Sequence, residues 1–108
     1  PEATPLLKVS GTRALGAEVI LKGDNFDEAY EYANEYAKEH SLTFVHPFDN
    51  IFVQAGQGTT ALEMLDTVPD LDYIVAPVGG GGLISGVASC AKQINPNIKI
   101  IAVGANSC

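Results

Sequence analysis

An apolar segment that runs directly into four glycines constrains the fold of this chain more than any other feature. Residues 73–78 read Tyr-Ile-Val-Ala-Pro-Val, and Gly79-Gly80-Gly81-Gly82 follow at once. A short, almost wholly apolar run is typical of a strand that is buried on both faces of a parallel sheet. Because each glycine loses extra backbone entropy on folding, four in succession indicate a backbone that must approach something closely.

The rest of the sequence alternates between helical and strand periodicities, which is typical of an α/β fold. Thr4 and Pro5 form the N-cap and first-residue pair of a helix, and Asp24 or Asn25 can cap another. Helices are therefore expected over residues 5–15, 26–40, 58–67 and 83–94. Strands are expected over residues 17–21, 43–45, 73–78 and 98–103, mainly parallel, so that helix and strand alternate throughout.

The glycine run lies between the end of a predicted strand and the first turn of a predicted helix. Unpaired backbone N–H groups and the positive end of the helix dipole converge at such a place. The sequence therefore predicts that an anion, with phosphate favoured, lies over residues 79–83. A tight turn without any ligand is the alternative.

The spacing of the glycines limits which kind of phosphate-containing ligand this loop could bind. A dinucleotide fingerprint needs glycine at its first, third and sixth positions, and the sixth is Ile84 or Ser85 here. The last predicted strand also ends at Gly104, with no acidic residue to hold a ribose. The P-loop pattern fails because Val87 follows Gly86. A phosphate monoester on a small cofactor remains.

Composition excludes other partners. The net charge is −7 with only six Lys plus Arg, so the clustered cations that nucleic-acid binding requires are missing. No apolar run approaches the roughly 20 residues that cross a bilayer, so no membrane partner is expected. Cys90 and Cys108 are too few for a disulfide scaffold, and two free thiols suit a cytoplasmic protein.

Five motifs follow one another across essentially the whole chain. They are residues 12–19 (Thr-Arg-Ala-Leu-Gly-Ala-Glu-Val), 26–29 (Phe-Asp-Glu-Ala), 46–49 (His-Pro-Phe-Asp), 55–59 (Ala-Gly-Gln-Gly-Thr) and 77–86 (Pro-Val-Gly-Gly-Gly-Gly-Leu-Ile-Ser-Gly). In this order they resemble fold-type II pyridoxal-phosphate enzymes of the threonine/serine dehydratase branch. Several spaced motifs in one order are more specific than the glycine run alone.

The resemblance implies part of a two-domain α/β enzyme of the tryptophan synthase β-like kind. Residues 1–45 would belong to the smaller domain, and residues 46–108 to the larger, cofactor-binding domain. Its reaction would remove ammonia from L-threonine or L-serine to give a 2-oxo acid. Such an enzyme would be a cytoplasmic homo-oligomer in amino-acid metabolism, with isoleucine biosynthesis among its roles. A serine racemase-like or other fold-type II pyridoxal-phosphate enzyme, or a non-catalytic anion-binding or interaction module, is the alternative.

The resemblance also implies which residues form the site. Pyridoxal 5'-phosphate would be held through its phosphate by the backbone N–H groups of Gly79, Gly80, Gly81, Gly82 and Leu83. His46 would be a substrate-binding residue, with a loop histidine packed beside Pro47 and Phe48 as the alternative. His40, near a helix end, is interpreted as a surface residue that complements the helix dipole.

The catalytic lysine of the family is not recognisable in this sequence. The family's lysine bonds covalently to the cofactor and lies in a Ser-x-Lys setting, which none of Lys8, Lys22, Lys38, Lys92 and Lys99 shares. The acidic residue that ends the family's last strand is replaced by Gly104, so no metal site is expected. We therefore expect no catalytic residue in this chain, which would be an internal fragment, inactive without the remaining segments of its parent enzyme.

Overall fold

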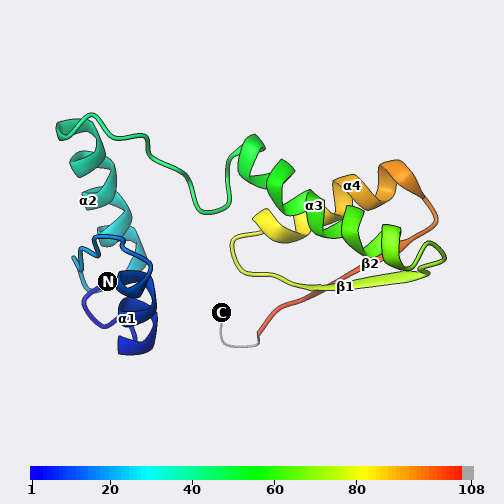
Figure 1. Cartoon of the computed structure of the whole chain (residues 1–108), viewed down its shortest axis with the longest axis horizontal. Coiled ribbons are helices and arrows are strands. Elements are labelled where there is room, and N and C mark those ends of the chain that lie inside the picture. The colour runs from blue at the N-terminus through cyan, green and yellow to red at the C-terminus, as the bar shows by residue number, and fades with distance from the viewer. Residues whose placement is uncertain (106–108) are drawn as a thin grey trace. The chain divides into compact units, whose positions relative to one another are not determined.

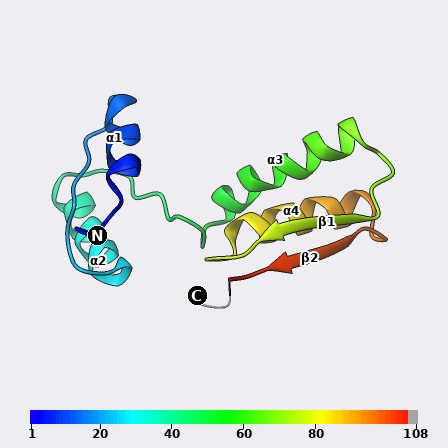
Figure 2. The same cartoon turned by 90° about the horizontal axis from the view of Figure 1, so that it is seen from below.

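The structure is a computed structural model that describes residues 1–105. Four helices and two strands follow one another in the order α1, α2, α3, β1, α4, β2 (Figures 1 and 2). The chain divides into two compact units, Pro1–Phe44 and Val45–Cys108. Cys108, one of the two thiols expected to be free, lies outside the described residues, whereas Cys90 is a free cysteine. None of the described helices is long and apolar enough to cross a membrane.

The first unit begins with helix α1, which spans Leu6–Ala14. Its N-cap is Pro5, and the Thr4 hydroxyl donates to the Pro1 carbonyl at 2.6 Å instead of capping the helix. The predicted Thr4 cap is therefore wrong, because a tight turn with Pro1 uses its side chain. Gly16 follows the helix with φ +86°, and its N–H donates to the Arg13 carbonyl at 2.9 Å, as expected of a helix stop.

Helix α2 spans Phe26–Glu39 and is capped at both ends as its sequence indicates. The Asn25 side-chain oxygen accepts from the Glu28 N–H at 3.0 Å, and Glu28 Oε2 accepts from the Asp24 N–H at 2.9 Å. This reciprocal arrangement is a capping box. His40 is the C-cap residue and is exposed, where its side chain lies beside the Tyr36 carbonyl at 3.0 Å.

The second unit is a β-α-β unit with one additional helix. Strands β1 (Tyr73–Pro77) and β2 (Lys99–Val103) pair in parallel, and helix α4 (Gly82–Ile94) joins them. Helix α3 spans Ile51–Thr67 and lies with α4 on one side of the strands (Figure 1). The core between these layers consists of buried apolar side chains: Ala61, Leu65, Ile74, Val87, Ala91 and Ile98.

Helices α3 and α4 approach each other closely at two glycines. A Cβ atom on Gly86 would overlap the Gln54 carbonyl oxygen, and one on Gly58 would lie 3.1 Å from the Gly86 carbonyl oxygen. Both atoms are backbone atoms that side-chain movement cannot displace. The contact between these two helices therefore requires the absence of a side chain at Gly86 and leaves little room for one at Gly58.

Strand β1 is buried on one face only. Ile74 and Ala76 are buried under the helices, whereas Tyr73 is 50% exposed and Val75 is 60% exposed. The expectation of burial on both faces is wrong for the described residues of the second unit, because α3 and α4 lie on one side and no other element of that unit covers the other side.

Two of the predicted strands do not form, and one helix is longer than predicted. No strand is present at residues 17–21 or 43–45, since neither segment has a hydrogen-bonded ladder with another part of the described chain. Helix α3 begins at Ile51 instead of residue 58. Its start is set by Asn50, whose side-chain oxygen accepts from the N–H groups of Phe52 at 2.9 Å and Val53 at 3.3 Å.

Candidate functional site

The glycine loop, residues 79–82, connects the end of β1 to the start of α4 (Figure 2). The N–H of Val78 donates to the Val103 carbonyl at 2.9 Å, and the N–H of Ser85 donates to the Gly81 carbonyl at 2.9 Å. Between these two bonds, the N–H groups of residues 79–84 donate to no protein acceptor within residues 1–105. The strand end therefore leaves a series of backbone donors without protein partners.

The charge distribution at this end of α4 favours an anion. Gly81 is the N-cap residue, at φ +88°, and supplies no side-chain oxygen to the helix. The first turn of α4 contains no acidic residue. Its unpaired N–H groups carry the positive end of the helix dipole, which attracts a negatively charged group.

Phe48 packs against one side of the glycine loop. A Cβ atom on Gly80 would overlap the Phe48 ring, and would lie 2.7 Å from its Cε1 atom. A Cβ atom on Gly82 would lie 2.8 Å from Phe48 Cα and 3.0 Å from its carbonyl oxygen. The lack of side chains at Gly80 and Gly82 is thus explained by close packing with the preceding loop.

Gly79 has no such explanation within residues 1–105. A Cβ atom on Gly79 would meet no atom within 4 Å, and its φ does not lie in the left-handed region. Gly81 also faces open space, but its φ of +88° favours glycine. Gly79 is exposed, so the space beside it is accessible.

His46 lies next to Phe48 and helps to shape its turn. His46 Nδ1 accepts from the N–H of Phe48 at 3.2 Å and from the N–H of Asp49 at 2.7 Å. The two rings lie 4.8 Å apart in an edge-to-face arrangement. An Nδ1 acceptor places the proton of a neutral imidazole on Nε2. The loop packing that the sequence left open for His46 is present.

The five predicted cofactor-binding residues, 79–83, lie in succession between the end of β1 and the first turn of α4. His46 is connected to them through Phe48, which packs against both the His46 ring and the glycine loop. Sequence reasoning missed Phe48 as the side chain between them. No local pattern could have indicated its role, because its packing partners Gly80 and Gly82 lie on another element. Whether these residues bind a ligand stays a prediction.

The two lysines of the second unit lie away from the glycine loop. Lys99 starts β2 and donates to the Tyr73 hydroxyl at 3.3 Å, while Lys92 donates to the Pro96 carbonyl at 2.9 Å. Both contacts lie at the start of the parallel strands, and the glycine loop follows the end of β1. Within the described ranges, no group of three His, Cys, Asp or Glu side chains could hold a metal ion.

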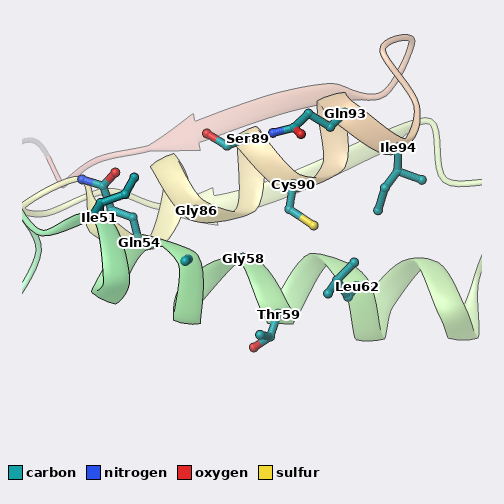
Figure 3. Close-up of a pocket in the computed structure, with 11 residues that line it drawn as sticks. Ile51, Gln54, Gly58, Thr59, Leu62, Gly86, Ser89, Cys90, Gln93 and Ile94 are labelled. Atoms are coloured by element: carbon teal, nitrogen blue, oxygen red, sulfur yellow. The ribbon is translucent and has the colours of Figure 1, made fainter.

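A separate groove of about 410 Å³ lies between α3 and α4. Figure 3 shows Cys90 and Ile94 of α4 pointing toward α3, near Leu62. No charged side chain and no residue from 79 to 83 lines this groove. It does not form part of the predicted phosphate site.

A parallel β-α-β unit with a glycine loop at the helix start defines an α/β protein of the kind that can bind a phosphate ester at that loop. The family model described as pyridoxal-phosphate dependent enzyme matches residues 1–108, and the chain belongs to this family. Its fold is accordingly that of fold-type II pyridoxal-phosphate enzymes, whose members use pyridoxal phosphate as cofactor.

The proteins that this chain resembles are named for more than one enzyme activity. The L-threonine dehydratase catabolic TdcB of Staphylococcus aureus is 50% identical over 107 residues, which are 99% of this chain and 31% of that protein. The processed form of threonine deaminase isoform 2 from Solanum lycopersicum has a TM-score of 0.85 at 46% identity, covering 96% of this chain and 29% of that one. Maize serine racemase has a TM-score of 0.89 at 37% identity, over 94% of this chain and 31% of that one. The chain thus spans about a third of its relatives' length.

Proposed function

We propose that the second unit supplies the phosphate-binding part of a pyridoxal-phosphate site. The backbone N–H groups of Gly79, Gly80, Gly81, Gly82 and Leu83 would hold the phosphate ester at the start of α4. One observation carries the proposal: these successive donors have no protein acceptor within the described residues, and Gly79 leaves open space beside them. The donor set fits an oxyanion because it consists of successive backbone N–H groups at the positive end of a helix.

The whole protein, of which this chain would be about a third, would act on L-threonine and L-serine. We infer a dehydratase that removes water and then ammonia to leave a 2-oxo acid. The support is the 50% identity to a threonine dehydratase over nearly all of this chain. A serine racemase-like activity is the second candidate, because the maize serine racemase structure superposes with a TM-score of 0.89.

Each residue of the site would have a defined part. The loop N–H groups bind the phosphate, and its orientation follows from the direction of α4. Phe48 packs against one side of the loop, at Gly80 and Gly82. His46 would meet the substrate through the Nε2 side of its ring, since Nδ1 is occupied by two backbone N–H groups. When bound, the cofactor withdraws electrons from the amino acid; the protein supplies binding and orientation.

The 108-residue chain alone would be inactive toward both amino acids. A family member needs a lysine at the cofactor, and Lys92 and Lys99 make contacts at the other end of the strands. The lysine would come from the remaining segments of the whole protein. The whole protein would be a cytoplasmic homo-oligomer, and the similarity to a relative named as catabolic favours a degradative role over isoleucine biosynthesis.

Two measurements test this proposal. Pyridoxal phosphate titrated into the whole protein should produce a visible absorbance band with saturable binding. A 2-oxo acid assay should then detect product from L-threonine or L-serine, while the 108-residue chain gives none. Accumulation of the D-amino acid in place of 2-oxo acid would favour the racemase-like activity. Absence of any saturable absorbance change in the whole protein would contradict the cofactor site itself.

A further inference from the structure

We infer that Phe48 is a positioning residue that sets the shape of the glycine loop and thereby its affinity for a phosphate group. This inference rests on the proposed function, because it concerns the same loop. Phe48 itself does not provide a donor to the ligand. It acts through Gly80 and Gly82, against which its ring and backbone lie.

The contact is closer than ordinary side-chain packing. The ring of Phe48 occupies the position that a Cβ atom on Gly80 would need, and the Phe48 backbone lies at 2.8 Å from the corresponding position on Gly82. Glycine is therefore required at both positions for this packing. A chain of four glycines is otherwise the most flexible backbone a protein can have, so a rigid surface beside it limits the conformations that it visits.

Phe48 is itself held from several directions. Its N–H donates to His46 Nδ1 at 3.2 Å, and the His46 ring lies edge-to-face against its own ring at 4.8 Å. Its carbonyl accepts from Gln54 Nε2 at 3.4 Å, which connects it to the first turn of α3. The ring is half-buried. The residue is thus fixed before any ligand binds, as a preorganised site requires.

The consequence is a binding loop that loses little conformational entropy when a ligand binds. Gly79 and Gly81 remain open on the side that Phe48 does not cover. An anion would therefore meet donors that are already ordered. Removal of the ring would free the loop, so that ordering it would oppose ligand binding.

The first test compares Phe48→Leu, Phe48→Tyr and the control Phe52→Leu in the whole protein. Affinity is measured for pyridoxal phosphate by visible absorbance and for inorganic phosphate by calorimetry. Phe48→Leu should weaken both affinities by about tenfold, because a loop that is no longer held must be ordered when the ligand binds. Phe48→Tyr keeps the ring and should restore most of the affinity. Phe52 is 83% exposed on α3, and its substitution should leave both affinities unchanged.

A double-mutant cycle separates positioning from a general loss of structure. Gly80→Ala alone should weaken phosphate binding, because its methyl group collides with the Phe48 ring. In a Phe48→Ala background the collision is absent, so the same change should cost far less. The combined loss should therefore be smaller than the product of the two single losses. Because residues in contact are also coupled in stability, the free energy of unfolding is measured for the same variants. Coupling in stability without coupling in phosphate affinity would contradict a positioning role.

The outcomes distinguish this inference from the proposed function. A wild-type protein that binds neither pyridoxal phosphate nor inorganic phosphate would overturn both. A wild-type protein that binds them, with Phe48→Leu binding as tightly, would overturn the role of Phe48 alone. If the loss of affinity in the double variant equalled the product of the two single losses, Phe48 and Gly80 would act independently. That result would likewise contradict the inference.

Discussion

At the scale of single residues, the four glycines of the loop are present for different physical reasons. Gly80 and Gly82 allow Phe48 to approach, and Gly81 adopts a left-handed conformation at the N-cap of α4. Gly79 alone has neither a close neighbour nor an unusual φ. Its missing side chain is what a bound group beside the loop would require.

Gly79→Ala should therefore weaken cofactor binding while leaving the stability of the fold nearly unchanged. The free energy of unfolding should stay within about 1 kcal/mol of the wild-type value, because the methyl group meets open space. Affinity for pyridoxal phosphate should fall by about tenfold or more, through a clash with the ligand and a displaced donor. Denaturant unfolding and a cofactor titration of the whole protein measure the two effects.

Gly82→Ala is the matched comparison within the same loop. Its methyl group would lie 2.8 Å from Phe48 Cα, so stability and cofactor affinity should both decrease. If Gly79→Ala bound the cofactor as tightly as the wild type, that result would contradict a ligand placed in the open space beside Gly79.

At the scale of elements, the contact between α3 and α4 determines how the second unit is built. Gly86 and Gly58 allow the two helices to approach with backbone atoms in contact. Gly56 lies on the same helix as Gly58, yet a Cβ atom there would meet nothing within 4 Å. A side chain would therefore crowd α4 at Gly58 but would meet no neighbour at Gly56, although both glycines lie on α3.

Gly86→Ala should destabilise the protein by at least about 1–3 kcal/mol, the usual cost of overpacking, because its methyl group overlaps the Gln54 carbonyl. Gly56→Ala should stabilise it by up to about 1 kcal/mol, since alanine favours the helix. Thermal or urea unfolding of the two variants measures the difference. Equal effects would show that the helices do not meet at Gly86 as described.

The start of α3 depends on one side chain that accepts two backbone N–H groups. Asn50→Ala should cost about 1 kcal/mol of stability, because the N–H groups of Phe52 and Val53 lose their acceptor. Asn50→Asp keeps a capping oxygen and should retain most of the stability. Urea unfolding compares them; a loss from Asp equal to that from Ala would contradict the cap.

The elements that the sequence predicted well are those specified by local patterns. Helices α2 and α4 and strands β1 and β2 lie within a few residues of their predicted positions, because periodicity, caps and glycines mark their ends. The segments at residues 17–21 and 43–45 have the composition of strands, but a strand also needs a hydrogen-bonded neighbour. The sequence pattern predicts too late a start for α3, because Gly56 and Gly58 weaken its helical pattern and the pattern does not identify Asn50 as the N-cap.

The candidate site was likewise predictable only where a local sequence pattern specifies it. The glycine loop and its position at the start of α4 followed from the sequence. The role of Phe48 did not, because it depends on a contact between residues 48 and 80–82 that only the fold creates.

At the scale of the whole molecule, the two-stranded sheet presents an apolar face that no described element of the second unit covers. Val75 and Val103 are 60% and 51% exposed, although a parallel sheet is ordinarily covered on both faces. The chain also spans about a third of the length of its relatives. We expect this face to become buried in the whole protein.

Two threonine substitutions on β1 test that expectation. In the 108-residue chain, Val75→Thr should change the free energy of unfolding by less than about 0.5 kcal/mol, because Val75 is exposed. Ile74→Thr should cost about 1–3 kcal/mol or more, because it buries a hydroxyl in the core. In the whole protein Val75→Thr should become comparably costly. A Val75→Thr effect that stays negligible there would show that the face remains uncovered.

The central claim is that the glycine loop holds a phosphate ester through its backbone N–H groups. The most direct measurement is nuclear magnetic resonance of the whole protein labelled with isotopic glycine, during titration with pyridoxal phosphate. The amide signals of Gly79, Gly80, Gly81 and Gly82 should shift together and saturate, while those of Gly11 and Gly56 remain unchanged. Saturation of the cofactor with no shift in the loop, or with shifts confined to glycines elsewhere, would contradict the account.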